Sequence, residues 1–194
     1  MVHTRRFYVK RRGWLYNWMK TFQRTLIHTY HYPFAERLNP KLHKIILEKA
    51  VNPDMGATMT LWKEGFNVKE FRLIGDWVHK IILEYFVDDF DEIFDLRLKD
   101  MWGQYYNKGD YQVTHHHNPH YWSFVYFVNA PKGAAPLVFT DSNKKVFPKP
   151  GMLVIFPGWL FHHVPKHKCD EIRSVISGNF VYALDWEKEK MRVR

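Results

Sequence analysis

From Leu96 onward the sequence is divided into short segments rich in β-branched and aromatic residues, separated by turns that contain Gly, Pro or Asn. Such segments are typical of β-strands. The candidate strands are residues 101–106, 111–117, 122–128, 136–140, 152–156 and 172–182. Many short strands in series, after a helical first half, predict an α+β chain that is mainly β. We expect a barrel or jelly roll with helices that buttress one side.

The first half carries the helical signals. Residues 25–34 approach strand alternation and end at Pro33, which predicts an opening strand. A helix is predicted to start with Asn39 as N-cap and Pro40 at the first helical position. A second helix is predicted from Asn67. Its apolar stripe, which we expect to be core, consists of Phe71, Ile74, Val78, Ile81, Ile82 and Tyr85.

The chain of 194 residues is long enough for one well-buried domain. We expect a basic, aromatic N-terminal arm at residues 1–24 and a single domain at residues 25–194. Within that domain, residues 25–95 are the helical support and residues 96–184 are the β core. No Asp or Glu occurs before Glu36, so the arm either contacts an acidic partner, such as nucleic acid, or is a solvated arm packed by its own aromatic residues.

Two absences guide the expected location and chemistry. No apolar run is long enough for a membrane span, and no secretory signal is visible, so we expect no membrane partner and a soluble, cytoplasmic protein. Cys169 is the single cysteine. A thiolate metal site is therefore excluded, and any metal would be held by histidine and carboxylate.

Histidines are concentrated at two places, residues 115–120 and residues 162–163. On a strand, His115 and His117 point to one face and His116 to the other. Two imidazoles from one strand and a third from a distant strand predict a facial metal site with open coordination positions. The alternatives are His116 with Asn118, which is a poor ligand for iron, or a polar strand with incidental histidines. Spacing barely separates His162 from His163 as the distal ligand.

The usual non-heme iron triad includes a carboxylate, but none stands two residues after His115. Asp110 and Asp141 are candidates, and three histidines are the simpler interpretation. Such a site has one negative charge fewer than the usual triad, so a negative co-substrate would contribute more of the binding energy. Arg173 follows His162 by eleven residues. A fixed cation beside a metal pocket suits a dicarboxylate.

Five stretches together resemble one enzyme family. They are residues 102–106 (WGQYY), 109–117 (GDYQVTHHH), 123–127 (SFVYF), 151–162 (GMLVIFPGWLFH) and 173–180 (RSVISGNF). This pattern resembles the Fe(II)/2-oxoglutarate-dependent oxygenases, in particular a group common in phages and bacteria. The resemblance is close over about residues 96–182. It implies a double-stranded β-helix (jelly roll) and a dioxygenase that hydroxylates its substrate with release of succinate and CO2. A phage protein of this kind would act in the host cytoplasm.

The resemblance also implies roles for individual residues. The iron ligands would be His115, His117 and His162, with His162 preferred because it follows Trp159 and Leu160. The residues that bind 2-oxoglutarate would be Arg173, Ser177, Tyr106 and Gln104. The cofactors implied are Fe(II), 2-oxoglutarate and O2, with ascorbate as a candidate reductant.

Four residues depart from the family pattern, and none is a proposed ligand. They are Gln104 in place of Asn, Phe124 in place of Gly, Gly158 in place of Ser, and Val175 in place of Ser. The last departure removes one hydrogen bond that the co-substrate would otherwise receive.

Two other functions fit parts of the sequence. A metal-dependent cupin shares the barrel and much of the histidine pattern, but the glutamate expected after His117 is missing and Arg173 would have no role. The second is a non-catalytic, basic module that binds nucleic acid or protein, in which the histidines would take part in no reaction. The primary substrate stays open among peptidyl proline, another protein side chain, a nucleobase and a small metabolite.

Overall fold

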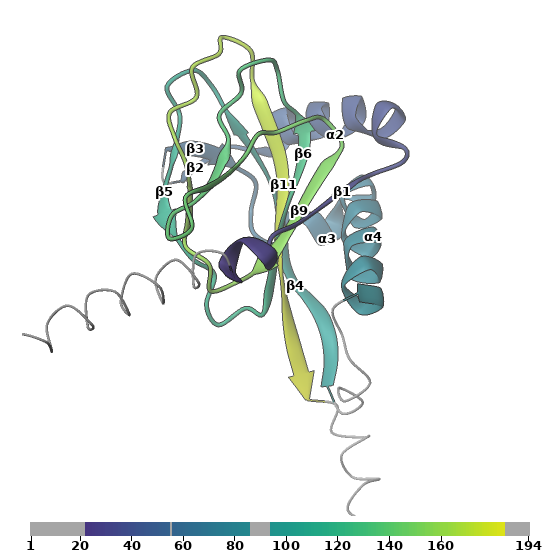
Figure 1. The fold of residues 1–194 in the computed structure, drawn as a ribbon. Coiled ribbons are helices and arrows are strands. Elements are labelled where there is room, and N and C mark those ends of the chain that lie inside the picture. The colour runs from purple at the N-terminus through teal and green to yellow at the C-terminus, as the bar shows by residue number, and fades with distance from the viewer. Residues whose placement is uncertain (1–21, 55, 86–93, 185–194) are drawn as a thin grey trace, which may run out of the picture.

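The computed structural model describes residues 22–54, 56–85 and 94–184. These residues form two antiparallel sheets and a layer of helices (Figure 1). The larger sheet has seven strands in the order β1-β9-β6-β11-β4-β3-β2, and the smaller has four in the order β5-β10-β7-β8. The expected basic arm lies outside the described residues apart from its last three positions.

The larger sheet is built around one long strand, β11, which lies between β4 and β6. Its strands are β1 (His28–His31), β2 (Asn52–Asp54), β3 (Ala57–Met59), β4 (Phe94–Tyr106), β6 (Trp122–Asn129), β9 (Met152–Pro157) and β11 (Arg173–Leu184). The smaller sheet consists of β5 (Gln112–His115), β7 (Leu137–Phe139), β8 (Lys144–Val146) and β10 (His162–Val164). All strand pairs among the described residues are antiparallel.

Helices cover one face of the larger sheet. They are α2 (Ala35–Lys49), α3 (Glu64–Asn67) and α4 (Lys69–Tyr85). The predicted stripe of α4 is buried from Phe71 to Ile82, whereas Tyr85 is exposed. The stripe packs with one face of the central strands, including Tyr126, Ile176 and Phe180. This confirms a mainly β chain with helical support on one side.

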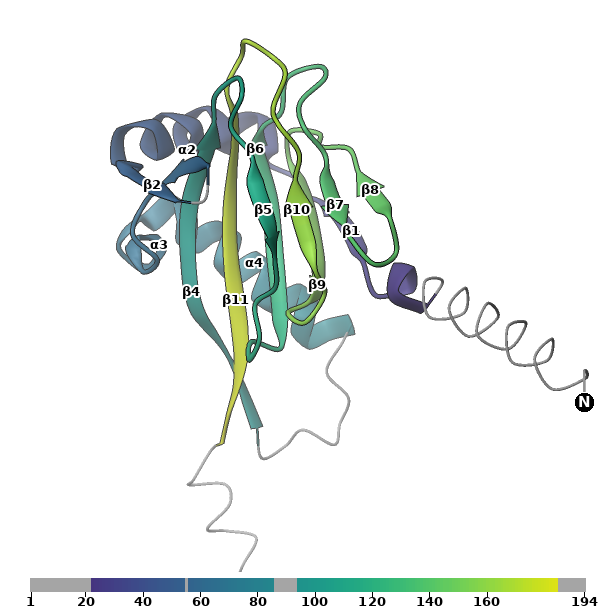
Figure 2. The same ribbon diagram turned by 90° about the vertical axis from the view of Figure 1, so that its left-hand side faces the viewer.

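The second core lies between the two sheets. It combines large apolar side chains of the larger sheet with those of the smaller one: Phe127, Val154, Phe156 and Val175 pack with Leu137, Phe139, Val146 and Val164. Figure 2 shows the smaller sheet in front of the larger one, with α4 behind. The central sheet therefore has both faces covered, which explains why β6 is buried at seven consecutive residues.

The first predicted helix start is wrong. Helix α2 begins at Ala35, and Asn39 and Pro40 lie inside it. Asn39 does not cap because its side chain is buried against the sheet, where Nδ2 donates to the carbonyl of Val128 at 2.8 Å and Oδ1 accepts from the hydroxyl of Tyr126 at 2.6 Å. Pro40 is tolerated because it removes only the donor to Glu36, whose carbonyl lies at the exposed start of the helix.

Other boundaries also differ from the prediction. Asn67 ends α3, and α4 begins two residues later at Lys69. The opening strand is shorter than expected, because residues 22–25 are helical and β1 covers only His28–His31. All six predicted strands of the second half are present, but β8 and β10 were not predicted. Each has three residues, which is too short for alternation to be visible. None of the described helices is long and apolar enough to cross a membrane.

Candidate metal centre

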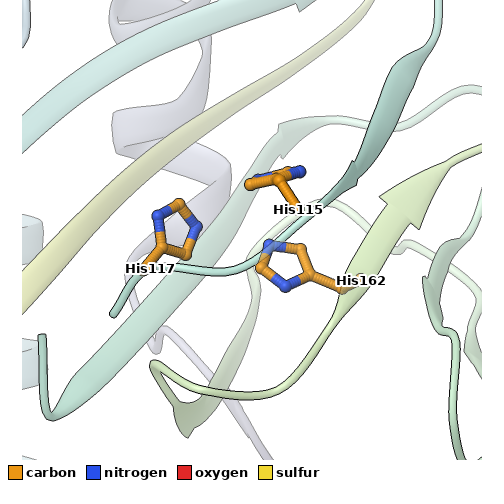
Figure 3. Close-up of side chains that lie close together, drawn as sticks. All are labelled: His115, His117 and His162. Carbon is orange, nitrogen blue, oxygen red and sulfur yellow. The ribbon is translucent and has the colours of Figure 1, made fainter. Parts of the chain in front are cut away.

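Three histidines converge between the sheets at the ends of β5 and β10. His115 is the last residue of β5, His162 is the first of β10, and the two are directly paired in the smaller sheet. His117 lies two residues beyond the end of β5. One ring nitrogen from each histidine lies within 4.8 Å of the others. Figure 3 shows the three side chains gathered in one place. The sequence selected these three residues, and the structure brings them together.

Hydrogen bonds to backbone carbonyls assign the tautomers of two of the histidines. Nδ1 of His115 lies 2.8 Å from the carbonyl of Val113, and Nδ1 of His162 lies 2.9 Å from the carbonyl of Leu160. A carbonyl only accepts, so each Nδ1 carries the hydrogen. Each Nε2 therefore keeps its lone pair. The hydrogen bond from Nδ1 to a carbonyl orients each ring and fixes its tautomer, as the hydrogen-bond partners of metal-bound histidines usually do.

Burial keeps His117 and His162 neutral. It lowers the pKa of His117 to about 2, with the neighbouring imidazoles adding a smaller effect in the same direction. It lowers the pKa of His162 to about 3, with His115 as the next contributor. Neutral imidazoles are the form that binds a metal ion. The site is therefore ready to accept a cation without first losing protons at neutral pH.

These pKa shifts predict that the metal-free protein loses stability as the pH falls below about 6.5. In the unfolded chain His117 and His162 bind protons near their ordinary pKa, whereas in the folded state they stay neutral. Between pH 6 and 5 the free energy of unfolding should fall by about 2–2.5 kcal/mol from these two residues together. Urea unfolding with a chelator present measures this, and His162→Asn should show a shallower slope. Equal slopes in the two proteins would contradict the assigned shifts.

The alternatives for the ligand set are not part of the histidine group, although His116 lines the same cavity. Within the described part of the chain, no carboxylate belongs to the histidine group. Oδ2 of Asp110 accepts from the backbone of Asn107 at 2.8 Å, and Asp141 is exposed. His116 accepts from the backbone of Asn118 and packs against Phe161. Nδ1 of His163 lies 3.3 Å from the hydroxyl of Thr140.

A cavity of about 170 Å³ joins the histidines to Arg173. Arg173 is the first residue of β11, and its side chain is 1% exposed. The guanidinium carbon lies 4.5 Å from the ring centre of Tyr106 and 5.2 Å from that of Phe127. Its Nε and Nη1 have no hydrogen-bond partner. Among the described residues no carboxylate lies within ion-pair distance of it.

Burial lowers the pKa of Arg173, and the side chain of Tyr106 acts in the opposite direction by favouring the charged form. A guanidinium remains protonated in proteins. A buried cation with two unused donors is unfavourable unless an anion pairs with it. The chemistry of this cavity thus calls for a small anion that occupies the space between Arg173 and the histidines.

The other predicted co-substrate residues line the same cavity. Ser177 lies four residues after Arg173 and shares its face of β11, as strand alternation predicts. Tyr106 and Gln104 enter from β4, which is paired with β11. Gln104 donates from Nε2 to Oε1 of Gln112 at 2.9 Å. Gln112 was not predicted as a site residue, although it is the first residue of the strand that carries His115.

An aromatic wall leads from the cavity toward solvent. Trp62 lines the cavity, is 49% exposed and lies 4.4 Å from the ring centre of Trp102. Trp102 in turn lies 6.2 Å from the ring centre of His117. Trp62 was missed because it lies in a loop, where no periodicity marks it. The wall offers an apolar surface to whatever enters beside the histidines.

Known structures share this architecture. The viral collagen prolyl hydroxylase of Paramecium Bursaria Chlorella virus-1, in complex with 2-oxoglutarate, aligns over 82% of this chain and 97% of its own (TM-score 0.64, 13% identity). A Pseudomonas putida prolyl-4-hydroxylase aligns over 80% and 91% (TM-score 0.62, 15% identity). HygX from Streptomyces hygroscopicus, with nickel and 2-oxoglutarate bound, aligns over 80% and 82% (TM-score 0.62, 11% identity).

The sequence itself matches no protein-family model and no curated protein. The structural likeness establishes the fold, which is that of the 2OG-Fe(II) oxygenases, so the resemblance seen in the sequence motifs is confirmed at this level. Within that fold, His115, His117 and His162 form a group able to hold a metal ion.

Proposed function

We propose that this protein is a non-heme Fe(II)- and 2-oxoglutarate-dependent dioxygenase that hydroxylates its substrate and releases succinate and CO2. The observation that carries the proposal is the placement of three histidines, and of a buried arginine whose Nε and Nη1 lack partners, on the walls of a single cavity. The same fold in known oxygenases supports it, and we further propose that residues 96–184 are a double-stranded β-helix core within a single domain at residues 25–194.

The donor set fits a metal ion that needs open coordination positions. His115, His117 and His162 supply three nitrogens from one side, and no cysteine is near to close the shell. Three imidazoles also suit other transition metals, so the choice of iron rests on the neighbouring Arg173 and on the fold. Bound Fe(II) and 2-oxoglutarate together would supply the activation of O2, with ascorbate as a candidate reductant.

The cavity fits a dicarboxylate. Arg173 would pair with the distal carboxylate through the nitrogens that now lack partners. Ser177 lies on the same strand face, and Tyr106 and Gln104 on the next strand limit how the co-substrate can turn. Because the ligand set lacks a carboxylate, the co-substrate would also supply negative charge to the metal. The apolar residues Leu137 and Val175 keep water from the reacting atoms.

The primary substrate remains a choice among several classes. Solved structures of this fold include a prolyl hydroxylase with a peptide fragment of a hypoxia-inducible factor and HygX with hygromycin B. The aromatic wall at Trp62 would contact the substrate as it approaches the metal. The basic N-terminal arm is proposed to bind an acidic partner or an acidic region of the substrate.

Turnover of 2-oxoglutarate tests this function without knowledge of the substrate. If the bound Fe(II) and 2-oxoglutarate react with O2 in the absence of the primary substrate, the protein with Fe(II) in air should form succinate. A chelator should stop the reaction, and so should His162→Ala. A protein that binds Fe(II) but neither binds nor consumes 2-oxoglutarate would instead be a cupin. Salt-dependent nucleic-acid binding without 2-oxoglutarate affinity would favour the binding module.

A further inference from the structure

The histidine cluster contains a fourth member, His120, that is not a candidate ligand but has partners at both ring nitrogens. Nδ1 lies 2.7 Å from the carbonyl of His117 and donates to it, because a carbonyl only accepts. Nε2 lies 3.4 Å from Oδ2 of Asp100. Because Nδ1 already carries a hydrogen, the contact with Asp100 is an ion pair when Nε2 is protonated as well, and in that form His120 links the backbone of one candidate metal ligand to a carboxylate in the larger sheet.

Asp100 is itself fixed by side chains on two further strands. Its Oδ1 accepts from Nδ2 of Asn179 at 2.7 Å, and Oδ1 of Asn179 accepts from the hydroxyl of Ser123 at 2.8 Å. The three residues are direct neighbours across β4, β11 and β6. Asn179 and Ser123 are each 1% exposed. This row of buried hydrogen bonds on three adjacent strands holds the Asp100 carboxylate, which contacts His120, in a fixed position.

His117 needs such support more than the other two histidines. The rings of His115 and His162 are each held by a carbonyl two residues earlier in the chain. The His117 ring has no such bond to a described residue, and β5 ends before it. Its position is set through its backbone, where N donates to the carbonyl of Gly158 at 2.7 Å and O accepts from both the backbone N of His120, at 2.8 Å, and Nδ1 of the same residue, at 2.7 Å.

Gly158 allows the two ligand-bearing loops to approach closely. Its N donates to the carbonyl of Tyr121, so it is bonded to the loop of His117 on both sides. A Cβ at this position would lie 2.2 Å from the carbonyl oxygen of His120. The loop of His117 is thus fixed between the turn that follows β9 and the Asp100 carboxylate.

We propose that Asp100 and His120 are positioning residues for the metal centre. They hold the His117 imidazole in the position at which it can bind the same metal ion as His115 and His162. This inference rests on the proposed function, since it assumes that the three histidines bind a metal. Neither residue contacts the metal position or the cavity. Their effect is exerted through the backbone of His117, and in metal sites the loss of such outer partners typically costs 10–100-fold in affinity.

Binding of Co(II) alone, without 2-oxoglutarate, tests the proposal. Asp100→Ala and His120→Ala should each bind Co(II) about 10–100-fold more weakly than the wild type. Two conservative variants separate the contacts. His120→Asn places an amide donor near the position of Nδ1 but loses the contact to Asp100, so its Co(II) affinity should lie between those of the wild type and His120→Ala, whereas His120→Gln keeps only the reach toward Asp100 and should bind more weakly than His120→Asn.

The matched control is Tyr126→Phe, which removes one buried hydrogen bond, to Asn39, on the helix-covered face of the same sheet. It should lower the thermal unfolding temperature and leave Co(II) affinity unchanged. A merely structural role for Asp100 and His120 would give the same result in their alanine variants.

Three outcomes would overturn the proposal. The first is Co(II) affinity within about threefold of the wild type in both alanine variants. The second, which also decides the matter if the alanine variants do not fold, is equal affinity in His120→Asn and His120→Gln. The third is a wild-type protein that binds no Co(II), which would remove the metal centre itself; the first two would leave the proposed function intact.

Discussion

Replacing Arg173 with methionine is expected to remove most of the affinity for 2-oxoglutarate and to leave the ligand-free protein at least as stable as the wild type. The two effects have one cause. In the ligand-free protein Arg173 is a buried cation whose Nε and Nη1 have no partner, so an apolar side chain of similar size removes an unfavourable group. With the dicarboxylate bound, the same nitrogens would make charge-assisted hydrogen bonds worth about 2–4 kcal/mol.

Calorimetric titration of the Fe(II)-loaded protein under anaerobic conditions measures the first effect, and thermal unfolding of the ligand-free protein measures the second. The binding constant should weaken by roughly 30- to 700-fold. The affinity of Arg173→Lys for 2-oxoglutarate should lie between those of the wild type and Arg173→Met, because lysine keeps the charge but loses the planar guanidinium. Arg24→Met, at a surface arginine bonded to the carbonyl of Ser142, is the control and should change neither quantity. Unchanged affinity in Arg173→Met would refute the role assigned to Arg173.

The second large effect is expected at His162. Its side chain is 3% exposed and belongs to the candidate metal group, whereas the adjacent His163 lies near the hydroxyl of Thr140. His162→Ala should therefore lower metal affinity by more than the roughly 10–100-fold that the loss of an outer partner costs. His163→Ala should bind metal nearly as the wild type does. Likewise, His117→Ala should lower metal affinity, and His116→Ala should bind metal nearly as the wild type does.

Metal content after dialysis against a defined concentration of free Fe(II) distinguishes these neighbours. The comparison is strict because each pair differs only in which of two consecutive histidines is removed. Metal loss in His163→Ala, with retention in His162→Ala, would show that the third ligand is His163 and that its assignment to His162 is wrong. Retention in all four variants would mean that the histidine group does not bind metal.

Much of this arrangement was predictable from local patterns. The strands of the second half and the apolar stripe of α4 follow from periodicity, and alternation along β11 places Arg173 and Ser177 on one face. The grouping of His115 with His117 was expected from alternation along a strand. In the structure β5 ends at His115, so the position of His117 instead depends on the loop that follows.

The remaining features depend on contacts between distant residues. Asn39 looks like a helix cap in the sequence, but Val128 and Tyr126 bond its side chain inside the core. Strand β10 is too short to show alternation, and pairing with β5 and β7 defines it. The row formed by Asp100, Asn179 and Ser123 joins residues as much as 79 positions apart. No local pattern in the sequence marks such a row.

The central claim is that one cavity holds both Fe(II) and 2-oxoglutarate. Anaerobic titration of the metal-free protein with Fe(II) and then 2-oxoglutarate tests it most directly, with visible absorption as the readout. The account predicts a metal-to-ligand charge-transfer band that appears only when both are present, saturates at one equivalent of each, and is lost in Arg173→Met and in His162→Ala. Fe(II) binding with no band on addition of 2-oxoglutarate would contradict it.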